Sequence, residues 1–256
     1  MNLSQYAVWV FYFFVVGACV GSFINVVIYR LPNGESVIRP RSRCPGCKER
    51  IKPWHNIPIL SYFLLLGKCA QCGNKISGRY PMVEMMTALL FSACYARFGL
   101  TPAAVAYMGF SGALVAVAFI DIDHFIIPDV ITLPGIVIGF ACSYFLLPIS
   151  IGNAFWGFLA GGGLFFLLAM AVPGGMGGGD IKLMGMIGAF LGLKPALITI
   201  FAGSLIGAVG GIIGMIAFGK GRKSKIPFGP YLVMGALAAL FFERELIELY
   251  MNAFVR

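Results

Sequence analysis

Residues 5–28 read QYAVWVFYFFVVGACVGSFINVVI, a stretch without a charged side chain. A helix needs roughly 20 apolar residues to cross the hydrocarbon core of a bilayer. The stretch therefore predicts a transmembrane helix. No charged residue precedes it and no small-residue cleavage site follows it, so we expect it to remain as the first helix instead of being removed as a signal peptide.

Comparable apolar runs continue along the rest of the chain. Hydrophobic residues make up 59% of the 256 residues and charged residues only 11%, whereas about 25% of a soluble domain is charged. Further runs lie at 82–98, 100–120, 130–149, 152–172, 195–219 and 228–242, and a shorter run at 181–193 has Lys182 at its start. The sequence therefore predicts an all-α polytopic membrane protein with seven to eight transmembrane helices.

The positive charge is concentrated in two loops. Ten of the 19 Lys and Arg residues lie from Arg30 to Arg79, and four more lie from Lys220 to Lys225. Loops rich in Lys and Arg stay in the cytoplasm, which places the N-terminus outside and residues 121–129 and 173–180 on the cytoplasmic side. This topology explains the net charge of +9 without a nucleic-acid partner.

Residues 29–80 form the one sizeable polar segment, between a first helix (1–28) and a remaining membrane domain (81–256). The segment contains Cys44 and Cys47 in one C-x2-C pair and Cys69 and Cys72 in a second. Two such pairs are typical of a zinc ribbon, since each presents two thiolates to a tetrahedral ion. A structural zinc would stabilise a segment too short for a large core. The alternatives are two disulfides, which the cytoplasm disfavours, or a redox C-x-x-C, which needs only one pair.

Four aspartates stand out because carboxylates are costly near apolar segments and call for a partner or a function. Asp121, Asp123 and Asp129 lie in IDIDHFIIPDV at 120–130, where one apolar run ends, and Asp180 lies in GGMGGGDIKLM at 174–184, where another begins. The topology places both stretches at one membrane face. Two close carboxylates cannot both ionise. The ionised member can then activate water and the protonated member can polarise a carbonyl, which predicts aspartic-type hydrolysis of a peptide bond.

The glycine run before Asp180 fits that chemistry. Glycines such as Gly177 and Gly179 let an extended peptide approach the backbone beside the carboxylate. Other interpretations are a flexible loop whose Asp180 caps a helix, a secondary transporter with intramembrane carboxylates, and a non-catalytic zinc-ribbon scaffold. The predicted position of the aspartates at helix ends and the lack of an inverted repeat disfavour transport, and a scaffold leaves Asp121 and Asp180 unexplained.

A D-x6-P-D stretch from Asp121 to Asp129, followed by G-x-G-D from Gly177 to Asp180, resembles the type IV prepilin peptidases. The resemblance extends over nearly the whole chain. It includes GSFINVVIYRLP at 21–32, both cysteine pairs, HNIPILSYFLLLGKC at 55–69 and ISGRYPMVE at 76–84. These stretches look like the bifunctional bacterial form of the family, a multi-pass protein of the bacterial inner membrane.

The resemblance implies that Asp121 and Asp180 are the catalytic pair of a membrane aspartyl protease, with Asp123 and Asp129 as supporting residues. It implies cleavage of type IV prepilins or type II secretion pseudopilins after a glycine, at the cytoplasmic membrane face. Membrane lipid surrounds such a protein, while the sequence leaves its oligomeric state open.

The bifunctional members also methylate the new N-terminal amine with S-adenosylmethionine, an activity associated with the cysteine-bearing loop that this chain retains. No glycine-rich nucleotide loop is visible in 29–80. Glu84 is the first candidate for methyl transfer, and Asn25, Arg30 and Arg79 are weaker ones. Glu84 can instead pair with an arginine, and Asn25 can hydrogen-bond between helices. A peptidase without methyltransferase activity is the alternative. His55 and His124 are left outside both sites.

Overall fold

The computed structural model describes residues 2–44, 46–172, 176–218 and 227–254. Two predicted features, the glycines at 174 and 175 and the basic segment 220–225, lie outside these residues. Within the described part the chain is helical, and its only β-type pairings are isolated bridges between Arg43 and Arg50 and between Lys68 and Lys75. The predicted all-α class is confirmed.

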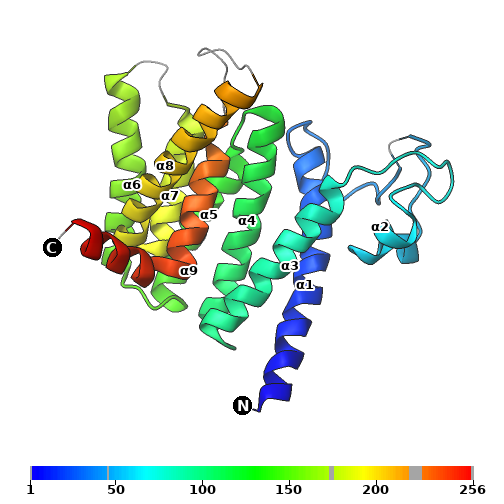
Figure 1. Ribbon diagram of the computed structural model, residues 1–256, viewed down its shortest axis with the longest axis horizontal. Helices are drawn as coiled ribbons and strands as arrows, with labels where there is room; N and C mark the ends of the chain where they lie inside the picture. The colour runs from blue at the N-terminus through cyan, green and yellow to red at the C-terminus, as the bar shows by residue number, and fades with distance from the viewer. Residues whose placement is uncertain (1, 45, 173–175, 219–226, 255–256) are drawn as a thin grey trace. The chain divides into compact units, whose positions relative to one another are not determined.

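Every predicted apolar run overlaps a helix (Figure 1). The elements are α1 (Leu3–Arg30), η1 (Pro53–Asn56), α2 (Leu60–Leu64), α3 (Arg79–Phe98), α4 (Pro102–His124), α5 (Asp129–Phe145), α6 (Ile151–Ala171), α7 (Gly178–Leu191), α8 (Leu193–Phe218) and α9 (Gly229–Phe254). Among the described residues, α1, α4, α6 and the Leu193–Gly214 part of α8 are long and apolar enough to cross a membrane, and α5 is apolar but shorter. The chain is thus a multi-pass membrane protein, and the total of seven to eight spans stays a prediction.

The chain divides into two compact units, residues 1–116 and 117–256, and α4 runs across the boundary. In the first unit α1 and α3 pack antiparallel with their backbones in contact. A Cβ added to Gly17 would lie 2.7 Å from Cα of Ala88, and one added to Gly21 would lie 2.7 Å from Cα of Glu84. One turn further along each helix, Nδ2 of Asn25 donates to the Tyr80 carbonyl at 3.0 Å. This register places Asn25 and Glu84 on facing helices.

Helix α7 is the centre of the second unit, with contacts to α5, α6, α8 and α9. All its residues from Leu183 to Leu191 are buried, as expected of a helix that is apolar on every side. Glycines allow its neighbour α6 to approach closely, since a Cβ added to Gly157 would lie 2.5 Å from the Gly188 carbonyl oxygen. The start of α7, which carries Asp180, is thereby fixed by packing along the rest of the helix.

Helix α9 extends past the predicted apolar run 228–242. Phe242, the last residue of that run, has a non-helical backbone with φ −129° and ψ 27°, so α9 consists of two helical segments joined at a kink. The second segment carries three acids, Glu243, Glu245 and Glu248. The predicted end of the apolar run therefore coincides with the kink, although the helix continues to Phe254.

Candidate active site and thiolate cluster

Asp121 lies in the last turns of α4, and only 5% of its surface is exposed. Its Oδ2 atom accepts a hydrogen bond from the backbone N–H of Gly229 at 2.9 Å. Gly229 is the first residue of α9, where backbone N–H groups have no partner within the helix and the helix dipole is positive. The hydrogen bond favours negative charge on the Asp121 carboxylate, whereas its burial disfavours that charge.

Asp180 lies in the first turn of α7, just before the predicted apolar run. Burial, and to a smaller extent the charge of Asp121, raise the pKa of the Asp180 carboxyl to about 6, against the opposing effect of a backbone hydrogen bond from Gly177. Like charges change one another's pKa only at short range. The two carboxylates therefore belong to one polar site, in which Asp180 keeps its proton up to about pH 6.

Ile127, in the loop between α4 and α5, lies against the starts of both α7 and α9. A Cβ added to Gly179 would lie 2.7 Å from Cβ of Ile127, and one added to Gly229 would lie 3.3 Å from its Cδ1. Three segments far apart in sequence thus meet at this residue. Their convergence explains how Asp121 and Asp180, which are 59 positions apart in the sequence, come to interact.

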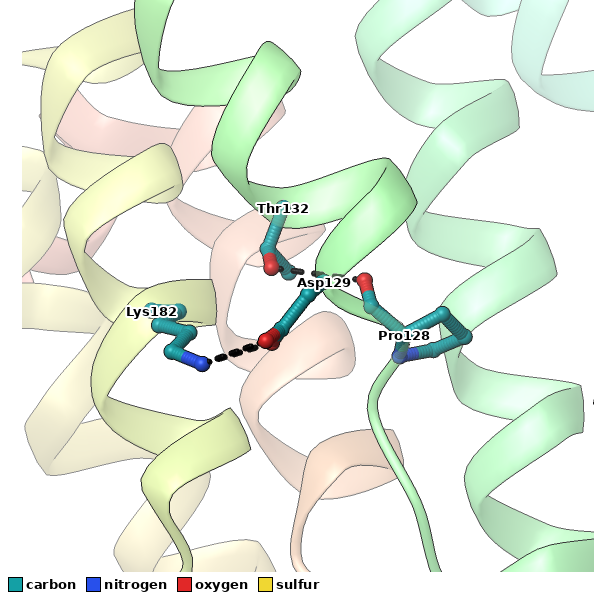
Figure 2. A network of polar contacts seen from close by, with 4 residues as sticks. All are labelled: Pro128, Asp129, Thr132 and Lys182. Carbon is teal, nitrogen blue, oxygen red and sulfur yellow. Dashed lines mark hydrogen bonds and ion pairs between the residues drawn. The ribbon is translucent and has the colours of Figure 1, made fainter.

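Asp129 is held by a partner that the sequence did not predict (Figure 2). Nζ of Lys182 lies 2.7 Å from both carboxylate oxygens of Asp129, and the Thr132 hydroxyl donates to the Pro128 carbonyl at 3.3 Å. The ion pair joins the start of α5 to α7, two residues after Asp180. Because both side chains are substantially exposed, the pair contributes little stability, and its effect is to orient the two helix starts.

The remaining predicted residues of this site occupy different positions. Gly177 precedes the first residue of α7, and a Cβ added there would lie 2.8 Å from Oδ2 of Asp180. Asp123 and His124 are exposed at the end of α4. Burial therefore separates Asp121, which is enclosed, from its neighbours in the same stretch.

The four cysteines of the first unit form one cluster. Their sulfur atoms all lie within 4.8 Å of one another, and Sγ of Cys44 lies 3.8 Å from Sγ of Cys72. With Zn–S bonds of about 2.3 Å, sulfurs at the corners of a tetrahedron are about 3.8 Å apart. None of the four is in a disulfide. The cluster therefore fits a zinc ion, and the disulfide alternative does not describe it.

The two cysteine pairs adopt the same local structure. In the first pair, the N–H of Cys44 donates to the Glu49 carbonyl and the N–H of Lys48 donates to the Cys44 carbonyl. In the second pair, the N–H of Cys69 donates to the Asn74 carbonyl and the N–H of Gly73 donates to the Cys69 carbonyl, and all four bonds are 2.8–3.0 Å long. Backbone N–H groups of Cys72 and Gln71 lower the pKa of the Cys69 thiol to about 6. The thiolate form is the metal ligand. Each pair is thus a separate knuckle that already presents its sulfurs.

A cavity of about 580 Å³ lies beside this cluster in the same unit. Asn25, Arg30, His55 and Glu84 line it, and Arg79 is not among its lining residues. Glu84 is buried, with 8% of its surface exposed, and its Oε2 accepts from the N–H of Ile59 at 2.7 Å. Glu84 therefore ties the cysteine-bearing segment to α3.

Two family models match the chain in sequence order. The bacterial peptidase A24 N-terminal domain matches residues 15–98, and the type IV leader peptidase family matches residues 108–212. A Pseudomonas aeruginosa protein named prepilin leader peptidase/N-methyltransferase is 35% identical over 93% of this chain and 92% of its own length. The chain belongs to the type IV leader peptidase family.

Other members of the family with the same name show the same relation. One from Bacillus subtilis is 35% identical over 93% of this chain and 96% of its own length. One from Myxococcus xanthus is 42% identical over 82% of this chain, and the match spans 64% of that longer protein. No solved structure matched the chain. The A24 N-terminal match contains the cysteine cluster and Glu84, and the leader peptidase match contains Asp121 and Asp180.

Two residues of this leader peptidase family member were missed by the sequence analysis. Gly229 contacts Asp121 from a position 108 residues later, beyond the range of the family match. Its signal is the Phe228-Gly229-Pro230 stretch at the start of an apolar run, because proline favours the first turn of a helix. Lys182 had only one signal, its position as a lone cation in the short run that follows Asp180.

Proposed function

We propose that the chain cleaves the leader peptide of type IV prepilins or type II secretion pseudopilins and N-methylates the new N-terminal residue with S-adenosylmethionine. The name shared by these relatives combines both activities in one protein, which disfavours a peptidase-only enzyme or a transporter. The observation that carries the peptidase proposal is the interaction of two acids: the Asp121 charge raises the pKa of Asp180. An ordinary helix-capping aspartate has no such partner.

The environments of the two acids assign their roles. The α9 N-terminus donates to Asp121, which favours its ionised form, and the pKa of Asp180 is raised to about 6, so we assign Asp121 as the ionised member and Asp180 as the protonated one. Asp121 takes a proton from water, whose oxygen attacks the scissile carbonyl carbon. Asp180 donates its proton to the carbonyl oxygen. As the C–N bond breaks, the proton held by Asp121 passes to the leaving amine, and the proton on the former carbonyl oxygen returns to Asp180 as the C=O bond re-forms.

We place the other predicted residues around this step. Asp129 and Lys182 hold the starts of α5 and α7, Asp123 is a supporting residue, and Gly177 and Gly179 keep side chains away from the approach to Asp180. The charge asymmetry of the sequence places these groups at the cytoplasmic face of a bacterial inner membrane. A prepilin bond between a basic leader and an apolar helix lies at that depth.

We assign methyl transfer to the first unit. Glu84 and Asn25 line a cavity whose size is in the range of small-molecule sites, about 300–1,000 Å³. When bound there, S-adenosylmethionine would supply the methyl group. Glu84 would accept the proton that the substrate amine must lose to become a nucleophile. Zinc on the four cysteines would have a structural role, holding the segment that forms much of the cavity wall.

The proposed parts of the chain are a first helix (1–28), a zinc-binding domain (29–80) and a transmembrane peptidase domain (81–256). The deciding experiment incubates the purified full chain with a prepilin, with and without S-adenosylmethionine, and measures the product mass. Loss of the leader plus one methyl is expected. Asp121→Asn and Asp180→Asn should each abolish cleavage in a folded protein, and full cleavage by either variant would remove that residue from the pair.

The two activities should separate by mutation. Asp180→Asn is expected to methylate an already trimmed pilin at a near-normal rate, because Glu84 and the cavity belong to the other unit. Glu84→Gln is expected to weaken methylation more than cleavage. Loss of both reactions in folded Asp180→Asn, on the trimmed substrate, would refute the assignment to two sites.

A further inference from the structure

Asn25 has one half of its side chain without a partner. The residue is 97% buried in α1, since 3% of its surface is exposed. Its Nδ2 donates to the Tyr80 carbonyl at 3.0 Å, and its Oδ1 is buried without a hydrogen-bond partner. Because a carbonyl can only accept, the nitrogen must face Tyr80 and the oxygen must be the unpaired atom. An unsatisfied buried acceptor costs about 1–3 kcal/mol.

The missing donor has to come from the cavity. Asn25 lies in the interior of α1, where the N–H groups are used within the helix. In the facing first turn of α3, the N–H groups of Arg79 and Tyr80 are bonded to Ser77 and that of Met82 is bonded to Gly78. Asn25 itself lines the 580 Å³ cavity, together with Glu84 from the facing helix. A ligand in this cavity would therefore meet an unpaired oxygen and a buried carboxylate, both of which attract a cationic N–H donor.

The outer part of the cavity has the opposite charge. Arg43, Lys48 and Lys52 line it from the cysteine-bearing segment, and all three are exposed. In all, six Lys and Arg residues line the cavity, against two exposed acids, Glu35 and Glu49. A buried acceptor pair combined with a basic rim complements a group that carries an ammonium and a carboxylate together. An amino-acid moiety has this charge pattern.

We propose that the cavity binds a primary ammonium group, with Oδ1 of Asn25 accepting one N–H and Glu84 supplying the opposing charge. The proposal rests on the proposed methyltransferase function, because both of its substrates carry such a group. One is the amino-acid end of S-adenosylmethionine, which the basic rim favours, and the other is the N-terminal amine of the trimmed pilin. Asn25 then binds the ligand through Oδ1 in addition to linking α1 to α3 through Nδ2.

Two substitutions at the same position separate these roles. Asn25→Leu and Asn25→Asp both remove the N–H that Tyr80 accepts, but only Asp keeps an oxygen at the position of Oδ1. A structural role predicts equal damage in both variants. An ammonium site predicts that Asp retains binding and Leu loses it. Asn33→Leu is the matched control, because Nδ2 of Asn33 also donates to a tyrosine carbonyl, that of Tyr29 at 2.6 Å, and Asn33 does not line the cavity.

The probes are S-adenosylhomocysteine, which keeps the amino-acid end, and 5′-methylthioadenosine, which lacks it. Calorimetric titration of the full chain in detergent should show that Asn25→Leu weakens the binding of S-adenosylhomocysteine about ten- to a hundredfold. Asn25→Asp should stay within about threefold of the parent chain, a difference too small to represent loss of a hydrogen bond. Binding of 5′-methylthioadenosine should be unaffected by all three variants.

A third measurement identifies the source of the ammonium group. If Asn25→Leu raises the KM for a free-amine pilin peptide and leaves S-adenosylhomocysteine binding unchanged, the pilin amine occupies the site. Equal losses in Asn25→Leu and Asn25→Asp, or no loss in either assay, overturn the proposal. Failure of the parent chain to methylate any pilin would refute the methyltransferase function separately, because the titrations do not depend on turnover.

Discussion

Gly229→Ala is expected to slow prepilin cleavage without unfolding the protein. Gly229 donates its backbone N–H to Oδ2 of Asp121 at 2.9 Å, and alanine keeps that N–H. The added Cβ, however, would lie 2.7 Å from the same oxygen and 3.2 Å from Cγ. The substitution therefore moves one carboxylate of the proposed dyad and removes no titrating group.

The size of the effect follows from that contact. Ordinary van der Waals contact with a Cβ begins at 3.4 Å, so Asp121 or the start of α9 must move by about 0.7 Å. A misplacement of about 1 Å in a catalytic group can cost about a hundredfold in rate. We expect kcat for cleavage to fall about ten- to a hundredfold, which corresponds to about 1.4–2.8 kcal/mol of activation free energy.

The assay follows conversion of a purified prepilin by gel shift and mass, with Gly178→Ala as the matched control. Gly178 is the first residue of α7, as Gly229 is of α9, but a Cβ added there meets no atom within 4 Å. The control should cleave at the parent rate. Methylation of a trimmed pilin by both variants verifies that the protein is folded. Cleavage by Gly229→Ala within about twofold of the parent chain, less than the effect of one hydrogen bond, would refute the proposed geometry.

Three other outcomes are expected. Burial raises the pKa of Asp180 from 3.8 to about 6, so the stability that its protonated form gives the folded state is complete below pH 3.8 and is lost as pH rises through 6. Asp180→Asn should therefore raise thermal stability at pH 8, by up to about 3 kcal/mol, but not at pH 4. Cys72→Ser should reduce bound zinc from one ion per chain, measured by elemental analysis, and expose the 29–80 segment to protease; an unchanged zinc content would contradict the tetrathiolate site. Lys182→Met should lower cleavage several-fold but change the unfolding free energy by less than about 1 kcal/mol, and a chemical-denaturation loss above 2 kcal/mol would show that the Asp129 pair is mainly structural.

The sequence was sufficient for features that depend on composition and local spacing. The apolar runs predicted the helices because a bilayer requires about 20 such residues in succession. The two cysteine pairs predicted one cluster because each knuckle is a local structure of four residues, and local geometry was confirmed by the sulfur distances. The role of α7 could not be predicted from its length, since only packing shows that this short helix is enclosed by four others.

Contacts between distant segments could not be predicted from the sequence, for a physical reason. Gly229 was not predicted because a backbone N–H leaves no mark in the residue type, and any residue except proline could donate it. The glycine itself is required by the space beside Asp121. Asn25 was weighed as an interhelical hydrogen-bond former, and its bond to Tyr80 confirms that role. The unpaired oxygen on the same side chain appears only when the donors around it are known.

Glycines surround the candidate dyad for a reason that packing alone does not provide. A Cβ at Gly177 would meet Oδ2 of Asp180, and a Cβ at Gly229 would meet Oδ2 of Asp121. Each acid is therefore covered on one side by backbone that carries no side chain. Peptide hydrolysis needs a substrate backbone within about 3 Å of both carboxylates, and extended chains approach most closely where no side chain intervenes. The same absence of Cβ lets the N-terminus of α9 reach Asp121 and favour its ionised form, so both substrate access and the proposed difference in protonation between the two acids depend on glycines.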